Sequence, residues 1–300
     1  MKAATHTEIY RPFRDALAPS RWAFWPLYRA QMAIATKRKL PLFILFFGPA
    51  MTGIVVSFLA YLQFQIEESG SGGPLISGGG LVAQFASQLL EVHKLIIAAM
   101  KTVRFFAVLA MAWYGAGLIC DDRRAGAHLL YFSRPLTRFD YMLAHFATAF
   151  TFGCCAVLGP GLLICLVATF NSPDFIFLTE KWPVIVATIG YSLVFVTALS
   201  ALILAVSALS KRKSYALAAV FGVFMSTLAL GGAMSALMRE RQWWMLSLAS
   251  HFERVADWWL GASRSFHRWD PWWSVAVLGG LTLVSFAIVA WRVRRMEVVA

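Results

Sequence analysis

Residues 182–210 read WPVIVATIGYSLVFVTALSALILAVSALS and contain no charged side chain. A helix needs about 20 apolar residues to cross the roughly 30 Å hydrocarbon core of a bilayer, so this stretch is long enough to span a membrane. Five other apolar stretches also lack charge, of which the second is the shortest: 40–66, 105–120, 141–173, 214–238 and 271–291. The sequence therefore predicts an all-α, polytopic membrane protein.

The composition of the whole chain agrees with this fold class. The chain has 300 residues, of which 59% are hydrophobic and only 14% are charged, and its mean hydropathy is +0.66. Soluble domains carry about 25% charged residues, so a soluble enzyme, a disordered chain and a disulfide-stapled secreted domain are excluded. The four cysteines lie in or beside apolar runs without CxxC spacing, which signals neither a disulfide framework nor a zinc site: Cys120, Cys154, Cys155 and Cys165.

We expect two parts, a cytoplasmic segment over residues 1–39 and a six-span transmembrane domain over residues 40–300. The expected spans are 40–64, 97–120, 141–170, 184–209, 214–238 and 272–292. Six spans place both termini on the same side of the membrane. Lys and Arg concentrate in cytoplasmic segments, and the whole net charge of +12 falls in the segments on that side: 1–39, 121–140, 211–213 and the C-terminal tail.

This charge distribution predicts a multi-pass protein of the bacterial cytoplasmic membrane with both termini in the cytoplasm. Basic segments at a membrane surface pair with anionic lipid, so membrane lipid rather than nucleic acid is the expected partner of the positive charge. Residues 22–39 mix Trp, Phe and Tyr with Arg and Lys. That mixture is typical of an amphipathic helix lying in the interface.

Two outer segments have distinct compositions. Residues 65–102 begin with a glycine-rich stretch and continue into a predicted helix. Residues 239–271 are rich in tryptophan, which prefers the headgroup level. The second segment is interpreted as a hairpin lying on the membrane, and a lid over an exit pathway is the alternative.

The cytoplasmic loop between the second and third expected spans is dense in charge of both signs. Residues 120–146 read CDDRRAGAHLLYFSRPLTRFDYMLAHF. We expect Asp121 and Asp122 to cap a short helix over 125–132, which Pro135 ends. Thr137 and Asp140 have the spacing of a capping box at the start of the third span.

This loop resembles the coupling-helix region of ABC-2-type transporter permeases. The resemblance rests on the acidic and basic run 121–124, on Gly126, and on the pattern Ser-Arg-Pro-Leu-x-Arg-x-x-Tyr over 133–141. The six-span layout and the basic amphipathic segment before the first span also match. Family members often carry Lys four residues after the Tyr, where this chain has His145.

The resemblance implies a permease subunit of an ATP-driven exporter that works as a homodimer or heterodimer. A separate cytoplasmic ABC ATPase, which holds ATP and Mg, would dock on loop 121–140. The implied ATPase contacts are Asp121, Asp122, Arg123, Arg124, Gly126, Arg134, Pro135, Leu136 and Arg138. Among these, Asp122 and Arg134 are expected to form the ion pairs with the ATPase.

The chain itself is not expected to be an enzyme. It contains no G-x-x-x-x-G-K-[ST] phosphate loop, and no catalytic, cofactor-binding or metal-binding residue is predicted. The uncharged runs also argue against an ion-coupled carrier, because such carriers need ionisable groups within the membrane. The alternative interpretation is a membrane anchor or scaffold subunit of an envelope or motility complex that transports nothing.

Overall fold

The computed structural model describes residues 23–37, 39, 42–43, 47–48, 50–55, 58, 92–127, 131, 136–171, 178–179, 182–261 and 269–295. All of the secondary structure in these residues is helical. Five helical segments are long and apolar enough to cross a membrane: Ala99–Arg124, Arg138–Phe170, Trp182–Leu209, Lys213–Met238 and Pro271–Arg294. The predicted class of helical membrane protein is therefore confirmed.

The expected first span, 40–64, lies largely outside the described residues. Its described residues, 42–43, 47–48, 50–55 and 58, are helical. One of them, Gly48, lies against α4 (Val92–Gly115), since a Cβ added there would overlap the ring of Phe106. The count of six spans stays a prediction.

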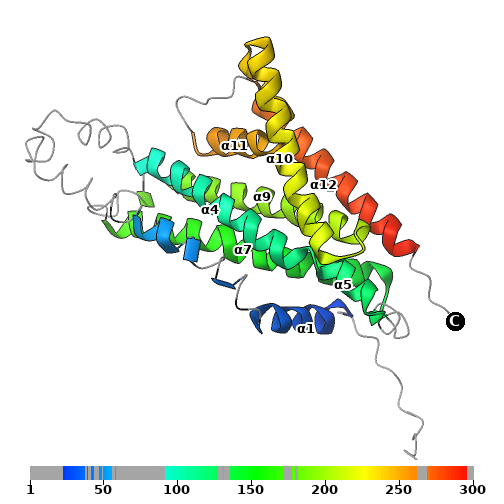
Figure 1. Ribbon diagram of the computed structural model, residues 1–300. Coiled ribbons are helices and arrows are strands. Elements are labelled where there is room, and N and C mark those ends of the chain that lie inside the picture. The colour runs from blue at the N-terminus through cyan, green and yellow to red at the C-terminus, as the bar shows by residue number, and fades with distance from the viewer. Residues whose placement is uncertain are drawn as a thin grey trace, which may run out of the picture.

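Helix α9 (Trp182–Leu209) occupies the centre of the bundle. It packs against α4, α7 (Arg138–Asn171) and α12 (Pro271–Arg294), as Figure 1 shows. It is apolar around its whole circumference, as a helix enclosed by others must be. Its C-terminal half is buried on nearly every side, with Leu199, Ile203 and Leu204 fully inaccessible.

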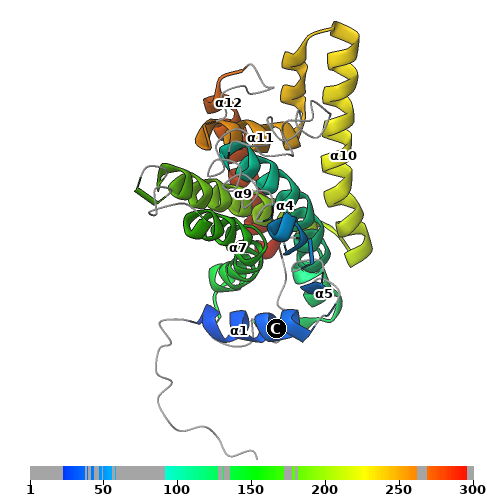
Figure 2. The same ribbon diagram turned by 90° about the vertical axis from the view of Figure 1, so that its left-hand side faces the viewer.

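Helix α10 (Lys213–Met238) differs from α9 because most of its surface faces outward. Its buried residues are Ala216, Val220, Phe224 and Gly231. The helix extends beyond the rest of the bundle at its C-terminal end, where η2 (Arg241–Leu246) packs beside it (Figures 1 and 2). An apolar helix of this kind suits contact with lipid or with another subunit.

Helix α1 (Phe24–Lys37) lies in the N-terminal segment, and its place in a membrane interface stays a prediction. It lies across the end of the bundle near α5 (Leu118–Arg124) in both views (Figures 1 and 2). Leu27, Gln31 and Ala35 are buried, and their four-residue spacing forms one face of the helix. Trp25 and Ile34 remain exposed, as a helix with one side in lipid requires.

The second span is longer than expected and is interrupted once. It consists of α4 and α5, which are separated by a turn at Ala116 and Gly117. The expectation that Asp121 and Asp122 cap a helix over 125–132 is wrong, because both residues lie within α5. The backbone there forms a helix up to Arg124, and Ala125 and Gly126 form a turn in which Gly126 has φ 67°.

That positive φ is readily accessible only to glycine, which explains the glycine at the end of α5. Beyond the turn, Ala127 and Tyr131 are helical, and the rest of 128–135 lies outside the described residues. The capping box at the start of α7 is confirmed. The Thr137 backbone N–H donates to Oδ2 of Asp140 over 3.2 Å, and the Asp140 N–H donates to Oγ1 of Thr137 over 3.1 Å.

Within 239–271, residues 248–259 form α11 (Leu248–Trp259), which is part of the bundle. This amphipathic helix packs against α12, α9, α10 and α4. It approaches α9 closely, since a Cβ added at Gly190 would lie 2.6 Å from the Trp259 ring. The sequence interpretation of a hairpin or lid did not include this packing, although Trp272 and Trp273 are exposed as expected of interfacial residues.

Candidate functional site

Most of the predicted ATPase-contact residues lie together at one end of the bundle. Asp121, Asp122, Arg123 and Arg124 belong to α5, Gly126 to the following turn, and Leu136 and Arg138 to the start of α7. Arg134 and Pro135 lie outside the described residues. Arg124 and Arg138 are exposed, whereas the others in the described part are partly buried. Among its described members, the loop therefore presents Arg124 and Arg138 outward.

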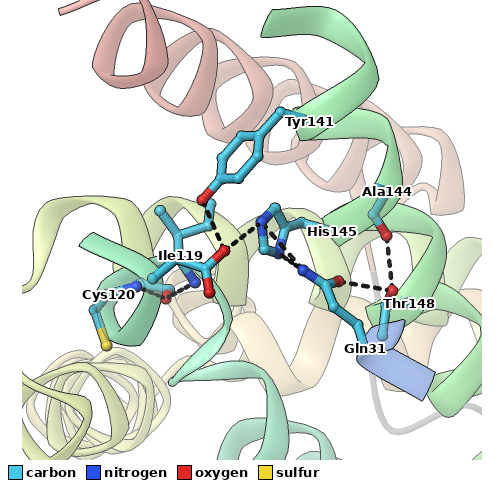
Figure 3. A network of polar contacts seen from close by, with 9 residues as sticks. Gln31, Ile119, Cys120, Tyr141, Ala144, His145 and Thr148 are labelled. Atoms are coloured by element: carbon cyan, nitrogen blue, oxygen red, sulfur yellow. Dashed lines mark hydrogen bonds and ion pairs between the residues drawn. The ribbon is translucent and has the colours of Figure 1, made fainter. Parts of the chain in front are cut away.

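Asp122 points toward α7 rather than toward the surface. Its Oδ2 atom lies 3.2 Å from Nε2 of His145, and the Tyr141 hydroxyl donates to the same oxygen over 3.3 Å. The imidazole of His145 is fully buried. Figure 3 shows the side chains of Tyr141 and His145 extending from α7 into the same region. Asp122 thus joins α5 to α7 within the chain.

The network continues from His145 to helix α1. The Nε2 atom of Gln31 lies 2.9 Å from Nδ1 of His145, and the Thr148 hydroxyl lies 3.0 Å from Oε1 of Gln31 (Figure 3). With the amide nitrogen donating to Nδ1, the imidazole proton belongs on Nε2 and is directed at Asp122. One buried chain of polar contacts therefore links α1, α7 and α5.

Two tyrosines attach α1 at further points. The Tyr114 hydroxyl, from α4, donates to the backbone carbonyl of Gln31 over 3.2 Å. The Tyr28 hydroxyl donates to Oγ1 of Thr151 in α7 over 3.1 Å. Because buried polar groups need partners, these contacts fix both the position and the rotation of α1. Helix α1 is therefore fastened to two of the candidate spans.

The turn between α4 and α5 is braced by α9. The Ser207 hydroxyl donates to the carbonyl of Ala116 over 2.8 Å and accepts from the N–H groups of Ile119 and Cys120 over 3.1 and 3.2 Å. These backbone groups flank the turn, so one side chain satisfies donors and acceptors on both sides of the interruption. A second contact runs from Nη1 of Arg123 to the carbonyl of Ala208 over 2.6 Å.

Sequence reasoning did not identify Gln31, Tyr28, Tyr114 or Ser207. The available signal was weak, since Gln31 is a single polar side chain between Leu27 and Ala35 on an otherwise apolar face. His145 was noted only as the residue that replaces a family lysine. Its actual neighbours come from helices that are far apart in the sequence, which no local pattern reveals.

A second polar cluster lies between α4 and α11. Arg104 Nη2 lies 2.7 Å from Oε1 of Glu253, and Arg104 Nη1 donates to the Tyr191 hydroxyl over 3.4 Å. Lys101 Nζ lies 3.9 Å from Oδ1 of Asp257, whose side chain is almost buried. The sequence left Arg104 without a partner, and the fold supplies Glu253 from a segment that was expected to lie outside the bundle.

No group of three or more His, Cys, Asp or Glu side chains able to hold a metal ion occurs in the part of the chain that the structure describes. The chain was compared with protein-family models and with curated proteins, and none of them matches it.

Proposed function

We propose that this chain is the membrane-spanning subunit of an ATP-driven exporter of the ABC-2 type, which a separate cytoplasmic ATPase drives through α5 and the start of α7. The observation that carries the proposal is the polar chain Asp122–His145–Gln31. It joins the charged loop 121–140 to α7 and to the interfacial helix α1.

These contacts are suited to transmit a movement of α5 to the helices that it touches. A push on α5 reaches α7 through Asp122 and reaches α9 through Ser207 and Arg123. Interfaces packed without voids transmit displacement because they do not deform continuously. The outward arginines Arg124 and Arg138 offer donors for carboxylates on a partner. The sequence itself lacks a phosphate-binding loop, so energy from ATP would have to come from another protein.

Charge reversal at Arg138 tests the proposal. Arg138 is exposed and begins α7, so a glutamate there adds favourable charge at a helix N-terminus and should leave the fold intact. The matched control is Arg212→Glu, which reverses an exposed arginine at the N-cap of α10. Arg134→Glu, at the residue that the resemblance places in an ion pair, is the second test variant.

The experiment purifies each tagged variant from native membranes in mild detergent and identifies co-purifying proteins by mass spectrometry. We expect a P-loop ATPase with the wild type and with Arg212→Glu, and at least a tenfold loss with Arg138→Glu or Arg134→Glu. Equal recovery from all four proteins would contradict the assigned contact. Absence of any P-loop ATPase from the wild type would contradict the exporter.

A non-transporting anchor subunit is the second candidate, and the dense packing around α9 is the observation that supports it. The ring of Phe195 and the side chains of Leu199 and Ile203 are fully buried, as a rigid core that does not move requires. Stable co-purification of envelope proteins without an ATPase would support this candidate.

A further inference from the structure

A pocket of about 440 Å³ opens beside α5 at the end of the bundle. Its lining comes from three separate parts of the chain: Cys120, Arg123 and Arg124 in α5, Ser210 and Lys211 between α9 and α10, and Arg292 and Arg295 at the end of α12. Its volume falls within the range of about 300–1,000 Å³ that is usual for small-ligand sites. We call it the basic pocket.

The basic pocket concentrates positive charge, with no acid among the described residues that line it. Four arginines and one lysine line it, and its lining includes no carboxylate. Arg123 and Arg292 interact as like charges, which costs energy unless an anion lies between them. None of the five cations forms an ion pair within the described residues.

The arginines are partly preorganised. Nη1 of Arg123 is held by the carbonyl of Ala208 over 2.6 Å. The guanidinium of Arg295 stacks over the Trp291 ring at 4.3 Å. Guanidinium groups present several N–H donors in a fixed plane, which matches the oxygens of a phosphate group. Fixing them in advance lowers the entropy that binding would cost.

The basic pocket lies where several candidate spans begin or end. Candidate spans end at Arg124, Leu209 and Arg294, and the next one begins at Lys213. Trp291 is exposed there, and Lys213 lies over the ring of Trp113 at 5.6 Å. Tryptophan next to basic residues at the ends of spans is typical of the headgroup region.

We propose that the basic pocket binds a phosphate group, and that in the membrane this group belongs to an anionic phospholipid headgroup. A free phosphate anion offers the same oxygens and is the other source. Basic pockets between transmembrane helices are suited to such headgroups. The basic pocket shares Arg123 and Arg124 with the predicted ATPase contact, but this proposal does not rest on the ATPase, because it concerns a ligand of the resting subunit.

The general excess of basic residues on this face does not explain the pocket. The orientation of the protein in the membrane requires positive charge in the loop 211–213 and in the tail. It does not require the basic side chains to point toward one another. Arg212 and Arg294 come from the same two segments, are exposed, and do not line the pocket. Their neighbours Lys211, Arg292 and Arg295 converge on it. This contrast provides a matched pair of variants.

The test compares two double variants. The pocket variant combines Lys211→Gln and Arg292→Gln, and the control variant combines Arg212→Gln and Arg294→Gln. Each removes two positive charges from the same face, and neither changes a residue implicated in ATPase contact. The proteins are reconstituted in phosphatidylcholine vesicles that contain spin-labelled phosphatidylglycerol or spin-labelled phosphatidylcholine. Electron paramagnetic resonance then measures the immobilised fraction of each lipid.

We expect the wild type and the control to immobilise phosphatidylglycerol in preference to phosphatidylcholine. Each basic residue near the surface favours anionic lipid about fivefold, so removal of the two cations that contact the headgroup should reduce this preference about tenfold or more. The control residues face solution, where salt screens their attraction, so the control should lose about threefold or less. A preference abolished by millimolar inorganic phosphate, with the same variant dependence, would assign the site to free phosphate.

Two results would overturn the proposal. The first is a wild type that shows no preference for phosphatidylglycerol and no binding of inorganic phosphate by isothermal titration calorimetry. The second is an equal loss in the two double variants, since that would show diffuse surface charge and no site. If the pocket variant loses its preference for phosphatidylglycerol but still co-purifies with the ATPase, the basic pocket is distinct from the proposed ATPase contact.

Discussion

The Nε2 atom of His145 lies 3.2 Å from the Oδ2 atom of Asp122, and this contact joins α5 to the N-terminal part of α7. The imidazole is fully buried, while 20% of the Asp122 side chain is accessible. A partly buried carboxylate at the end of α5, held by a fully buried partner in α7, is a suitable point for an external force to enter the bundle.

Removal of the His145 imidazole should destabilise the protein. His145→Leu leaves the Asp122 carboxylate and the Gln31 amide without their shared partner, and a buried polar group without a partner costs about 1–3 kcal/mol. Tyr141→Phe is the control, because it removes the 3.3 Å contact to Asp122 but keeps the buried ring, and it should cost about 1 kcal/mol. Reversible unfolding in mixed micelles measures both. Equal stabilities of His145→Leu and the wild type would show that the network contributes nothing.

The coupling between these two residues can be isolated with a double-mutant cycle. Asp122→Asn combined with His145→Leu should cost less than the sum of the two single changes, by about 0.5–3 kcal/mol, because residues in one network are not additive. Additive effects would mean that the 3.2 Å contact is not energetically significant.

Ser207 should stabilise the turn that separates α4 from α5. Ser207→Ala leaves the Ala116 carbonyl and the N–H groups of Ile119 and Cys120 without the hydroxyl, and we expect a loss of about 2 kcal/mol in the free energy of unfolding. The same change at Ser200, whose buried hydroxyl has no hydrogen-bond partner in the structure, removes no such contact. Ser200→Ala should therefore be neutral or stabilising. The prediction fails if the two alanine variants have equal stability.

The ion pair between Arg104 and Glu253 should hold α11 against α4. The side chain of Arg104 is 11% accessible, so Arg104→Leu removes a charge-assisted contact to Glu253 at a cost of about 2 kcal/mol. The exchanged pair, Arg104→Glu with Glu253→Arg, keeps opposite charges at the two positions and should recover part of that loss. Protease sensitivity of 241–261 reports release of α11. Similar cleavage of the wild type and Arg104→Leu would exclude this anchoring role.

Some segments of the fold were predictable from the sequence and others were not. Long uncharged runs identify the candidate spans after residue 92, because apolar length alone decides whether a helix can cross a bilayer. The capping box of Thr137 and Asp140 was predictable because its partners lie three residues apart. The placement of α11 was not predictable, since its composition suits an interfacial hairpin. Its position is determined by contacts with remote residues such as Arg104 and Gly190.

The candidate site was predictable only in its outline. Charge and the pattern over 133–141 indicated the loop, but they did not indicate that Asp122 turns inward to His145. The reason is that its partners Tyr141 and His145 come from α7, and His145 in turn contacts Gln31, which is remote in sequence. A single sequence gives no signal for such contacts. The assumed capping role of Asp121 and Asp122 was wrong for a related reason. Helix α5 continues from the span, so no new helix begins at these residues.

Gly190 should be required for the contact between α9 and α11. A Cβ at this position would lie 2.6 Å from Cζ3 of Trp259 and 3.1 Å from Cε3, so Gly190→Ala forces the ring or the helix to move. Overpacking of this kind costs about 1–3 kcal/mol, which exceeds the gain of about 1 kcal/mol that alanine offers over glycine in a helix. We therefore expect a net loss of stability, measured by reversible unfolding in mixed micelles.

Gly279→Ala is the matched control, because an added Cβ there meets nothing within 4 Å. It should be neutral or raise stability by up to about 1 kcal/mol through helix propensity alone. The double variant Gly190→Ala with Trp259→Phe places a smaller ring opposite the new methyl group and should regain part of the loss. If Gly190→Ala is as stable as Gly279→Ala, α11 does not press against α9 at this point. Its attachment to the bundle would then depend on the Arg104–Glu253 ion pair and its neighbours.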